Sequence, residues 1–350
     1  MFGLLMVLVT SAHAESWCAA PVVAHEWGVQ SFRLDGGTPE GLAIPDAYHR
    51  RPGTPRKVAR VVDMPVDGGN RCLPVVHFYA NNNFGADTPI AIDVGFTQGE
   101  ASVWYPQVDR LQTDSGTDVQ LGWDSLTLRA EPQGDHVSTD VPWVSELRGF
   151  NDALWVEHDN ESERFVFYEA DTHESPAVRI SLSRASTSER PHLLAHNEGQ
   201  APVHDVVVVH RNGDAVWSAR IPIIQPGHTA SAVAQPNSTG EAWLRERITD
   251  TEAVLADDIA LDWSQECVMM RNPAEPFTAT DDHRLYPHEV DALMTAWQGR
   301  FFDDEGTRVV YREDTASLQA NMPLSIYTDM YHYVTLQRLG LTLVEGITLL

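Results

Sequence analysis

The chain has 350 residues, of which 24 are Lys or Arg and 50 are Asp or Glu, giving a formal net charge of −26. This charge argues against nucleic acid and anionic lipid as partners, because binding to either depends on basic patches that offset phosphate charge. The hydrophobic fraction of 43% is enough for packed cores, so a wholly disordered chain is excluded.

The first fourteen residues have the pattern of a secretory signal peptide. A short apolar run covers residues 2–9, and Ala12-His13-Ala14 supplies the small residues that signal peptidase recognises. We therefore expect residues 1–14 to be removed and the protein to be exported to the periplasm or the medium. A buried N-terminal strand is the alternative explanation of the same run. No stretch reaches the roughly 20 apolar residues of a transmembrane helix, so we expect no membrane span.

After export, the three cysteines would enter an oxidising compartment. Cys18, Cys72 and Cys267 allow one disulfide and leave one thiol over. The sequence leaves the pairing open, and we predict Cys18–Cys72 because both lie near the mature N-terminus. No Cys-x-x-Cys motif occurs, which excludes a zinc ribbon.

Residues 15–175 are predicted to form a β-rich N-terminal domain. Short segments rich in β-branched and aromatic residues alternate with turn-forming stretches such as 67–70 and 81–83. Regular short strands separated by turns are typical of a sandwich or barrel. Residues 35–60 hold several Pro, Gly and Arg residues and are predicted to form a long loop. The predicted strands are 22–32, 73–80, 90–96, 101–105, 125–130, 153–157 and 164–170.

Residues 176–236 are predicted to form a small, Ig-like β-sandwich. Asn212-Gly213 between two apolar runs is a strong signal for a hairpin turn. In the strand before this turn, Val206 and Val208 point to one face and Val207 and Val209 to the other, which predicts a strand covered on both sides. The predicted strands are 178–184, 192–197, 203–210 and 216–221.

Residues 237–350 are predicted to form a smaller α+β region. Ser238 and Glu241 have the spacing of a capping box at the start of one helix. A second helix is expected from Pro287, with an apolar stripe that should pack on a sheet containing 307–312. The final strand is predicted over 334–344. The stripe consists of Val290, Leu293, Met294, Trp297 and Phe301. The fold class is therefore predicted to be mainly β, with β-sandwich domains.

Linear catalytic signatures are missing from the chain. The motifs GxSxG, SxxK, HExxH, GxxxxGK[ST], GxGxxG and the EF-hand loop do not occur. This removes many hydrolases and nucleotide-dependent enzymes, but not enzymes that lack a linear motif.

The segment His25-Glu26-Trp27-Gly28 gathers three chemically active residues near the mature N-terminus. On a strand, His25 and Trp27 would share one face and Glu26 would lie on the other. His25 is a candidate metal ligand or general base. The structural alternative is a buried Trp27 with a hydrogen-bonded His25 beside it.

Two further polar clusters are candidate cation sites. Asp282, His283 and His288 lie at the predicted start of the second helix and could bind a divalent metal such as zinc. The alternative is that acidic residues there stabilise the helix dipole. The acidic loop 157–163 is a candidate calcium site, with a solvated turn as the alternative.

Several segments along the chain form an ordered set of motifs. They are Ala24-His25-Glu26-Trp27-Gly28, 73–79, 103–106, Glu163-Arg164-Phe165-Val166-Phe167-Tyr168, Trp297 with Phe301-Phe302, Glu305-Gly306-Thr307-Arg308-Val309-Val310-Tyr311 and Met322-Pro323-Leu324. Together these segments resemble an uncharacterised family of exported bacterial proteins. Val29-Gln30-Ser31 departs from the Thr-Phe-Thr of that family, and Ser102 stands where the family has Glu. Since no activity is established for the family, the resemblance implies export and architecture only.

Two functions follow from these observations. The first is a non-catalytic envelope or secreted protein that binds an envelope component, a glycan or another protein. The second is a metal-dependent hydrolase that uses His25, Glu26 and His77, with Tyr105 nearby. A hydrolase requires these side chains to converge in one concave pocket. A binding module predicts instead that they are separated or buried in packing.

Overall fold

The computed structural model describes residues 20–35, 41–53, 69–80, 87–112, 119–182, 192–236, 240–251, 274–329 and 332–347. The prediction of a mainly β fold is confirmed, since three sheets account for most of the regular structure. Within the described ranges, no helix has both the length and the apolar character needed to cross a membrane.

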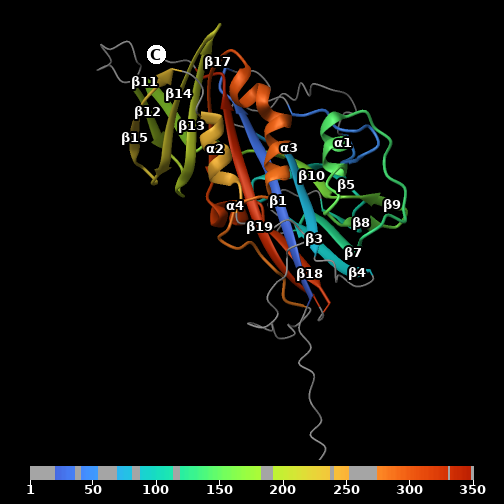
Figure 1. Ribbon diagram of the computed structural model, residues 1–350. Coiled ribbons are helices and arrows are strands. Elements are labelled where there is room, and N and C mark those ends of the chain that lie inside the picture. Colours follow the sequence, from blue (N-terminus) through green and yellow to red (C-terminus); the bar gives the residue numbers. More distant parts are fainter. Residues whose placement is uncertain are drawn as a thin grey trace, which may run out of the picture.

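A ten-stranded sheet with the order β16-β14-β13-β17-β19-β1-β3-β10-β5-β2 forms the middle layer (Figure 1). The long neighbours β1 and β19 run parallel, and the other neighbouring strands are antiparallel. The sheet spans the predicted domain boundaries at 175–176 and 236–237. Its strands are β1 (Ala20–Arg33), β2 (His49–Arg50), β3 (Gly69–Ala80), β5 (Gly99–Tyr105), β10 (Val166–Thr172), β13 (Val203–Asn212), β14 (Ala215–Ile224), β16 (Gln235–Pro236), β17 (Gly306–Glu313) and β19 (His332–Glu345).

Two smaller sheets cover one face of the ten-stranded sheet. The six-stranded sheet shares one apolar cluster with the β1 end that holds Ala24. The three-stranded sheet shares another with the β1 end that holds Phe32. The strands are β4 (Thr88–Val94), β6 (Arg110–Leu111), β7 (Leu121–Arg129), β8 (Trp155–His158), β9 (Glu161–Glu163) and β18 (Leu324–Thr328) in the first, and β11 (Val178–Leu182), β12 (His192–Asn197) and β15 (Thr229–Val233) in the second.

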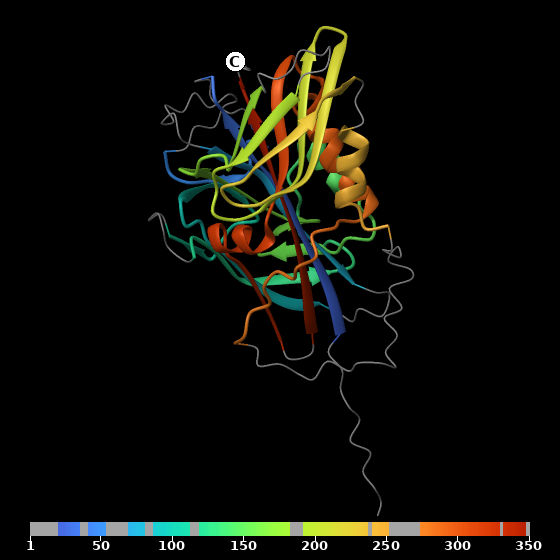
Figure 2. The same cartoon turned by 90° about the vertical axis from the view of Figure 1, so that its left-hand side faces the viewer.

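Helices cover the opposite face of the ten-stranded sheet. Helices α1 (Pro142–Arg148), α2 (Gly240–Ile248) and α3 (Pro287–Gln298) contribute their buried residues to one apolar cluster. Helix α3 continues into a π-helical turn, η2 (Gly299–Asp303). Figure 2 shows the short helix α4 (Thr315–Asn321) on the other side of the long strands, where Leu318 packs in the cluster of the six-stranded sheet.

Alternation on the central strands decides which side chain meets which layer. In β13, Val207 and Val209 pack in the helix-covered cluster, whereas Val206 and Val208 pack under the three-stranded sheet. The prediction of a strand covered on both faces is therefore confirmed. The hairpin at Gly213, where φ is 60°, is also confirmed between β13 and β14.

A polar strip separates the two apolar clusters on the face that carries the smaller sheets. Alternate residues of β1 and β19 point to this face, and they pair in register. The end pairs are apolar, and the three middle pairs are charged, glycine-only and polar. From one end to the other the pairs are Ala24–Leu336, Glu26–Arg338, Gly28–Gly340, Gln30–Thr342 and Phe32–Val344. Apolar packing is interrupted here, so the two smaller sheets have separate cores.

The predicted second helix and final strand are confirmed by α3, with its buried apolar stripe, and by β19. Helices α1 and α4 were not predicted. Helix α2 is described from Gly240, so the predicted cap at Ser238 lies outside the described residues. Residues 1–14, Cys18 and Cys267 also lie outside them. Cys72 is buried in β3 with its Sγ 2.8 Å from Asn70 Oδ1, and the Cys18–Cys72 disulfide stays a prediction.

Candidate functional site

His25 and His77 lie directly opposite each other on the neighbouring strands β1 and β3, beneath helix α3. The Nδ1 atom of His25 lies 2.6 Å from Oε2 of Glu289, in the first turn of α3. Two aromatic rings enclose the His25 imidazole, that of Tyr79 at 5.4 Å and that of Tyr286 at 4.5 Å between centroids. The structure thus brings together two of the predicted site residues and adds Glu289, which was not predicted.

This histidine cluster is closed off from solvent. His25 is 1% exposed, and both His77 and Glu289 are 0% exposed. The Nδ1 atom of His77 lies 3.2 Å from the carbonyl oxygen of Arg164. Among the described residues, Nε2 of each ring and Oε1 of Glu289 are buried without a hydrogen-bond partner.

The charge states within the cluster follow from burial and from the His25–Glu289 contact. Burial would raise the pKa of Glu289, but the His25 ring and the Tyr286 N–H outweigh it and hold this pKa at about 2. Burial lowers the pKa of His77 to about 4, so His77 is neutral near pH 7. At that pH the cluster contains an ionised Glu289 carboxylate, on the buried side of α3, and an uncharged His77 ring.

His288, predicted as a metal ligand, lies at the exposed edge of the same cluster. Its Nε2 atom is 3.4 Å from the Tyr79 hydroxyl and 3.6 Å from Oδ1 of Asp152, and its side chain is 27% exposed. The other two residues of that predicted set have different partners. Asp282 accepts hydrogen bonds from Arg284, and burial together with Arg312 lowers the pKa of His283.

The described residues offer no group of three or more His, Cys, Asp or Glu side chains that could hold a metal ion. In the acidic loop 157–163, the carboxylates already have protein partners. Glu157 accepts hydrogen bonds from the Gln133 and Gly134 N–H groups, and Glu163 pairs with Arg148. Neither the zinc nor the calcium prediction gains support from this geometry.

Glu26 lies on the opposite face of β1 from His25, as the strand alternation predicted. Its carboxylate is 2% exposed and forms an ion pair with Arg338 of β19. Arg338 donates two hydrogen bonds to this carboxylate, and the Tyr168 hydroxyl donates a third at 2.5 Å. Glu26 and His25 are neighbours on β1, and their side chains lie on opposite faces of the sheet. They do not converge in one pocket, so the proposed hydrolase site is not assembled.

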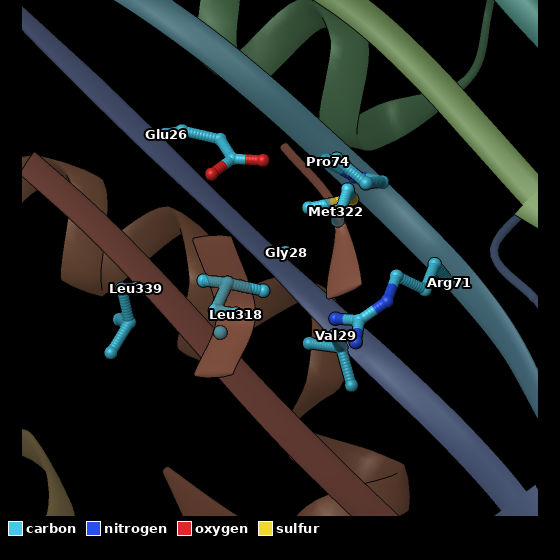
Figure 3. A pocket seen from close by; sticks show the side chains of 9 residues that line it. Glu26, Gly28, Val29, Arg71, Pro74, Leu318, Met322 and Leu339 are labelled. Atoms are coloured by element: carbon cyan, nitrogen blue, oxygen red, sulfur yellow. The ribbon is translucent and has the colours of Figure 1, made fainter. Parts of the chain in front are cut away.

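A small cavity of about 10 Å³ lies next to Glu26 in the polar strip. Figure 3 shows Glu26 and Arg71 towards two sides of this cavity, with Gly28 between them. Gly28 pairs with Gly340, and neither residue has a side chain to fill the space. A cavity of this size has room for about one water molecule, so it is part of the packing of the strip rather than a substrate site.

Tyr105 is placed away from both groups. It lies on β5, which is separated from β3 by β10, and its ring stacks on Tyr48 at 4.7 Å and on His49 at 6.0 Å. Burial raises its pKa above the ordinary value of 10.0. The proximity of Tyr105 to His77 that the hydrolase prediction required is therefore not observed.

A much larger cleft, of about 400 Å³, lies at the polar strip beside helix α4 and the segments that flank the three-stranded sheet. The ten-stranded sheet supplies its floor, helix α4 supplies one wall, and segments 174–177 and 198–203 supply further lining. The floor residues are Gln30, Tyr311, Glu313 and Thr342, and the α4 wall consists of Asp314, Ser317 and Asn321.

The cleft is lined by four carboxylates, Glu174, Glu198, Glu313 and Asp314, and by no Lys, Arg or His side chain of the described residues. Arg71, 4% exposed, lies behind the floor. Its guanidinium donates to both Glu313 oxygens at 3.0 Å and to Glu174 at 3.2 Å.

Sequence reasoning missed this cleft because its residues come from seven separate stretches of the chain. The one local signal was the alternation of polar residues and glycine along β1, Glu26-x-Gly28-x-Gln30, repeated along β19 as Arg338-x-Gly340-x-Thr342. On the face of a buried strand, such an interruption of the apolar pattern marks a break between cores.

Comparison with known proteins adds no assignment. No protein-family model and no curated protein matches the chain. Several solved structures match the chain, and two of them illustrate the level of similarity. One is the yeast delta-COP-I mu-homology domain complexed with a Dsl1 WxWxV peptide, at 8% identity and a TM-score of 0.32, covering 94% of this chain and 96% of that chain. The other is the yeast delta-COP-I mu-homology domain, at 8% identity and a TM-score of 0.31 with the same coverage. Both TM-scores lie below 0.5, so neither likeness carries an argument about this chain.

Proposed function

We propose that the chain is an exported binding protein whose ligand occupies the 400 Å³ cleft above the polar strip, beside α4. The observation that carries this proposal is the cleft itself. Its volume of about 400 Å³ falls in the range of about 300–1,000 Å³ that is usual for ligand sites. Its floor belongs to the central sheet, and a rigid support of this kind favours specific binding.

The positions of the predicted catalytic residues also support a binding role. His25 and His77 are almost fully buried beneath α3, and Glu26 is held by Arg338 on the other side of β1. A binding module predicts such separation, whereas a hydrolase needs these side chains beside one accessible pocket. In the proposed role, the histidine cluster and the Glu26–Arg338 pair fix the layers that form the cleft.

The lining defines what kind of ligand can bind. Besides the four carboxylates, the lining includes the side-chain amides of Gln98, Gln200 and Asn321, and these three amides have no hydrogen-bond partner among the described residues. Their donors and acceptors can therefore bind a polar small molecule or a polar segment of a partner, either a glycan or a protein. Export, inferred from residues 1–14, would place this ligand in the envelope or outside the cell.

A panel of probes with a cleft-blocking variant tests the proposal. Spermidine, maltotriose and citrate represent cationic, neutral and anionic polar ligands, and isothermal titration calorimetry measures their binding. Ala201 lines the cleft, so Ala201→Trp should abolish binding, whereas the exposed Ala215 lies outside it and Ala215→Trp should not. The proposal is refuted if no probe binds, or if the two variants bind a probe equally well.

A further inference from the structure

The cleft holds more negative charge than its surroundings neutralise. At the floor, the single guanidinium of Arg71 is shared between Glu174 and Glu313. One positive charge thus faces two negative charges, and a net negative charge remains below the ligand position. Gln30 donates a hydrogen bond to Glu174 at 3.0 Å and Thr342 donates one to Glu313 at 3.2 Å, which holds both carboxylates in place.

At the rim, Glu198 is only weakly compensated. It is 47% exposed and pairs with Arg179, which is 71% exposed. Ion pairs with this exposure are weak, and a ligand can replace such an arginine at small cost. The Glu198 carboxylate is therefore available to a ligand.

The negative charge of Asp314 is neutralised by neighbouring cations even less than that of Glu198. Its side chain accepts a hydrogen bond from the Ser317 N–H and so caps α4, and the nearest ring nitrogen is His204 Nε2 at 3.6 Å. Burial and the neighbouring Arg312 lower the pKa of His204 below 6.5, so this ring is neutral near pH 7. The charge of Asp314 therefore stays in the cleft.

We infer that the ligand of the cleft is a small organic polycation, with two or more ammonium groups spaced along a flexible chain. This inference rests on the proposed function and names its ligand class. Glu198 and Asp314 would accept charge-assisted hydrogen bonds from the ammonium groups, which are stronger than those between neutral partners. The formal net charge of −26 raises the local concentration of any cation near the molecule. A free polyamine and a lysine-rich segment of a partner share this chemistry.

The test uses calorimetric titration of the full chain with spermidine, with trilysine and with maltotriose. Glu198→Gln and Asp314→Asn each remove one charge, and Asn still caps the N-terminus of α4. Each should weaken spermidine binding by about five-fold at low salt, as expected for the loss of one unit charge about 4 Å away in water. The matched control is Glu246→Gln, an exposed carboxylate on α2 at the opposite face of the sheet, and it should change binding by less than about two-fold.

Each outcome decides the inference. Binding of spermidine or trilysine that weakens in both cleft variants and spares Glu246→Gln supports it, and the stronger of the two probes identifies the source. If maltotriose binds and Ala201→Trp abolishes this, while neither cation binds, the polycation inference is wrong and the proposed function stands. If Glu246→Gln weakens cation binding as much as the cleft variants do, the net charge alone attracts the cation and the inference is wrong. If no probe binds, the proposed function fails as well.

Discussion

Replacing Arg338 by Met should strongly destabilise the fold, because it leaves the Glu26 carboxylate buried without its counter-ion. Glu26 is 2% exposed and would keep only the Tyr168 hydroxyl as a partner. Removing one member of a buried ion pair costs about 3–5 kcal/mol. Arg338 also donates to the Gln319 side chain at 2.6 Å and the Met322 carbonyl at 2.8 Å, and both acceptors would lose this partner. We expect a loss of about 4 kcal/mol in the free energy of unfolding, a large part of the roughly 5–15 kcal/mol typical of a domain.

Urea denaturation followed by tryptophan fluorescence and circular dichroism measures this loss. The double variant Glu26→Gln/Arg338→Met removes both charges and should recover at least about 2 kcal/mol of the loss, because no uncompensated charge remains. Arg220→Met, at an exposed position of β14, is the matched control and should stay within about 0.5 kcal/mol of the wild type. A loss below about 1 kcal/mol for Arg338→Met would show instead that the Glu26–Arg338 pair is solvated and contributes little to stability.

Four further predictions concern the packing around the histidine cluster and the polar strip. The free energy of unfolding should fall by about 3 kcal/mol as the pH drops from 6.5 to 4, because His77 takes up a proton in the unfolded chain before it does so in the folded one. A pH series of urea titrations measures this loss, and His77→Gln should flatten the curve over this range. Between pH 4.5 and 2 a further loss is expected as Glu289, with its pKa held at about 2, becomes protonated in the unfolded chain first. Gly28→Ala should lower the free energy of unfolding by about 1–3 kcal/mol in the same assay, because the new Cβ would lie 3.0 Å from the Cα of Pro74. An unchanged free energy of unfolding would show that β3 can move to accommodate the Cβ. His25→Gln should lower the unfolding temperature by several degrees, since it removes the ring that contacts the buried Glu289 carboxylate at 2.6 Å, and an unchanged temperature would contradict a structural role for His25.

Local patterns in the sequence predicted the parts of the fold that depend on nearest neighbours. Alternation placed His25 and Glu26 on opposite faces of β1, and a 3.6-residue period placed Val290 and Trp297 on the buried side of α3. These predictions succeeded because side-chain direction follows from strand and helix geometry alone. Helix α1, only seven residues long, is too short to show a full helical period.

Properties that depend on long-range pairing could not be predicted. The parallel contact between β1 and β19 joins residues more than 300 positions apart, and only this contact brings Arg338 to Glu26. The same holds for Glu289, which meets His25 across 264 positions. Alternation along β1 predicts that Glu26 and His25 lie in different environments. Their partners depend on which strands pair and in which register, and tertiary packing sets both.

A crystal structure of the protein soaked with the probe that binds most tightly in the calorimetric panel would show whether the cleft is the ligand site. We expect electron density for the probe in the cleft, within hydrogen-bond distance of Glu198 or Asp314, with the layers around it unchanged. Density for the probe against His25, His77 or His288, with the cleft empty, would show that the ligand site is the histidine cluster instead.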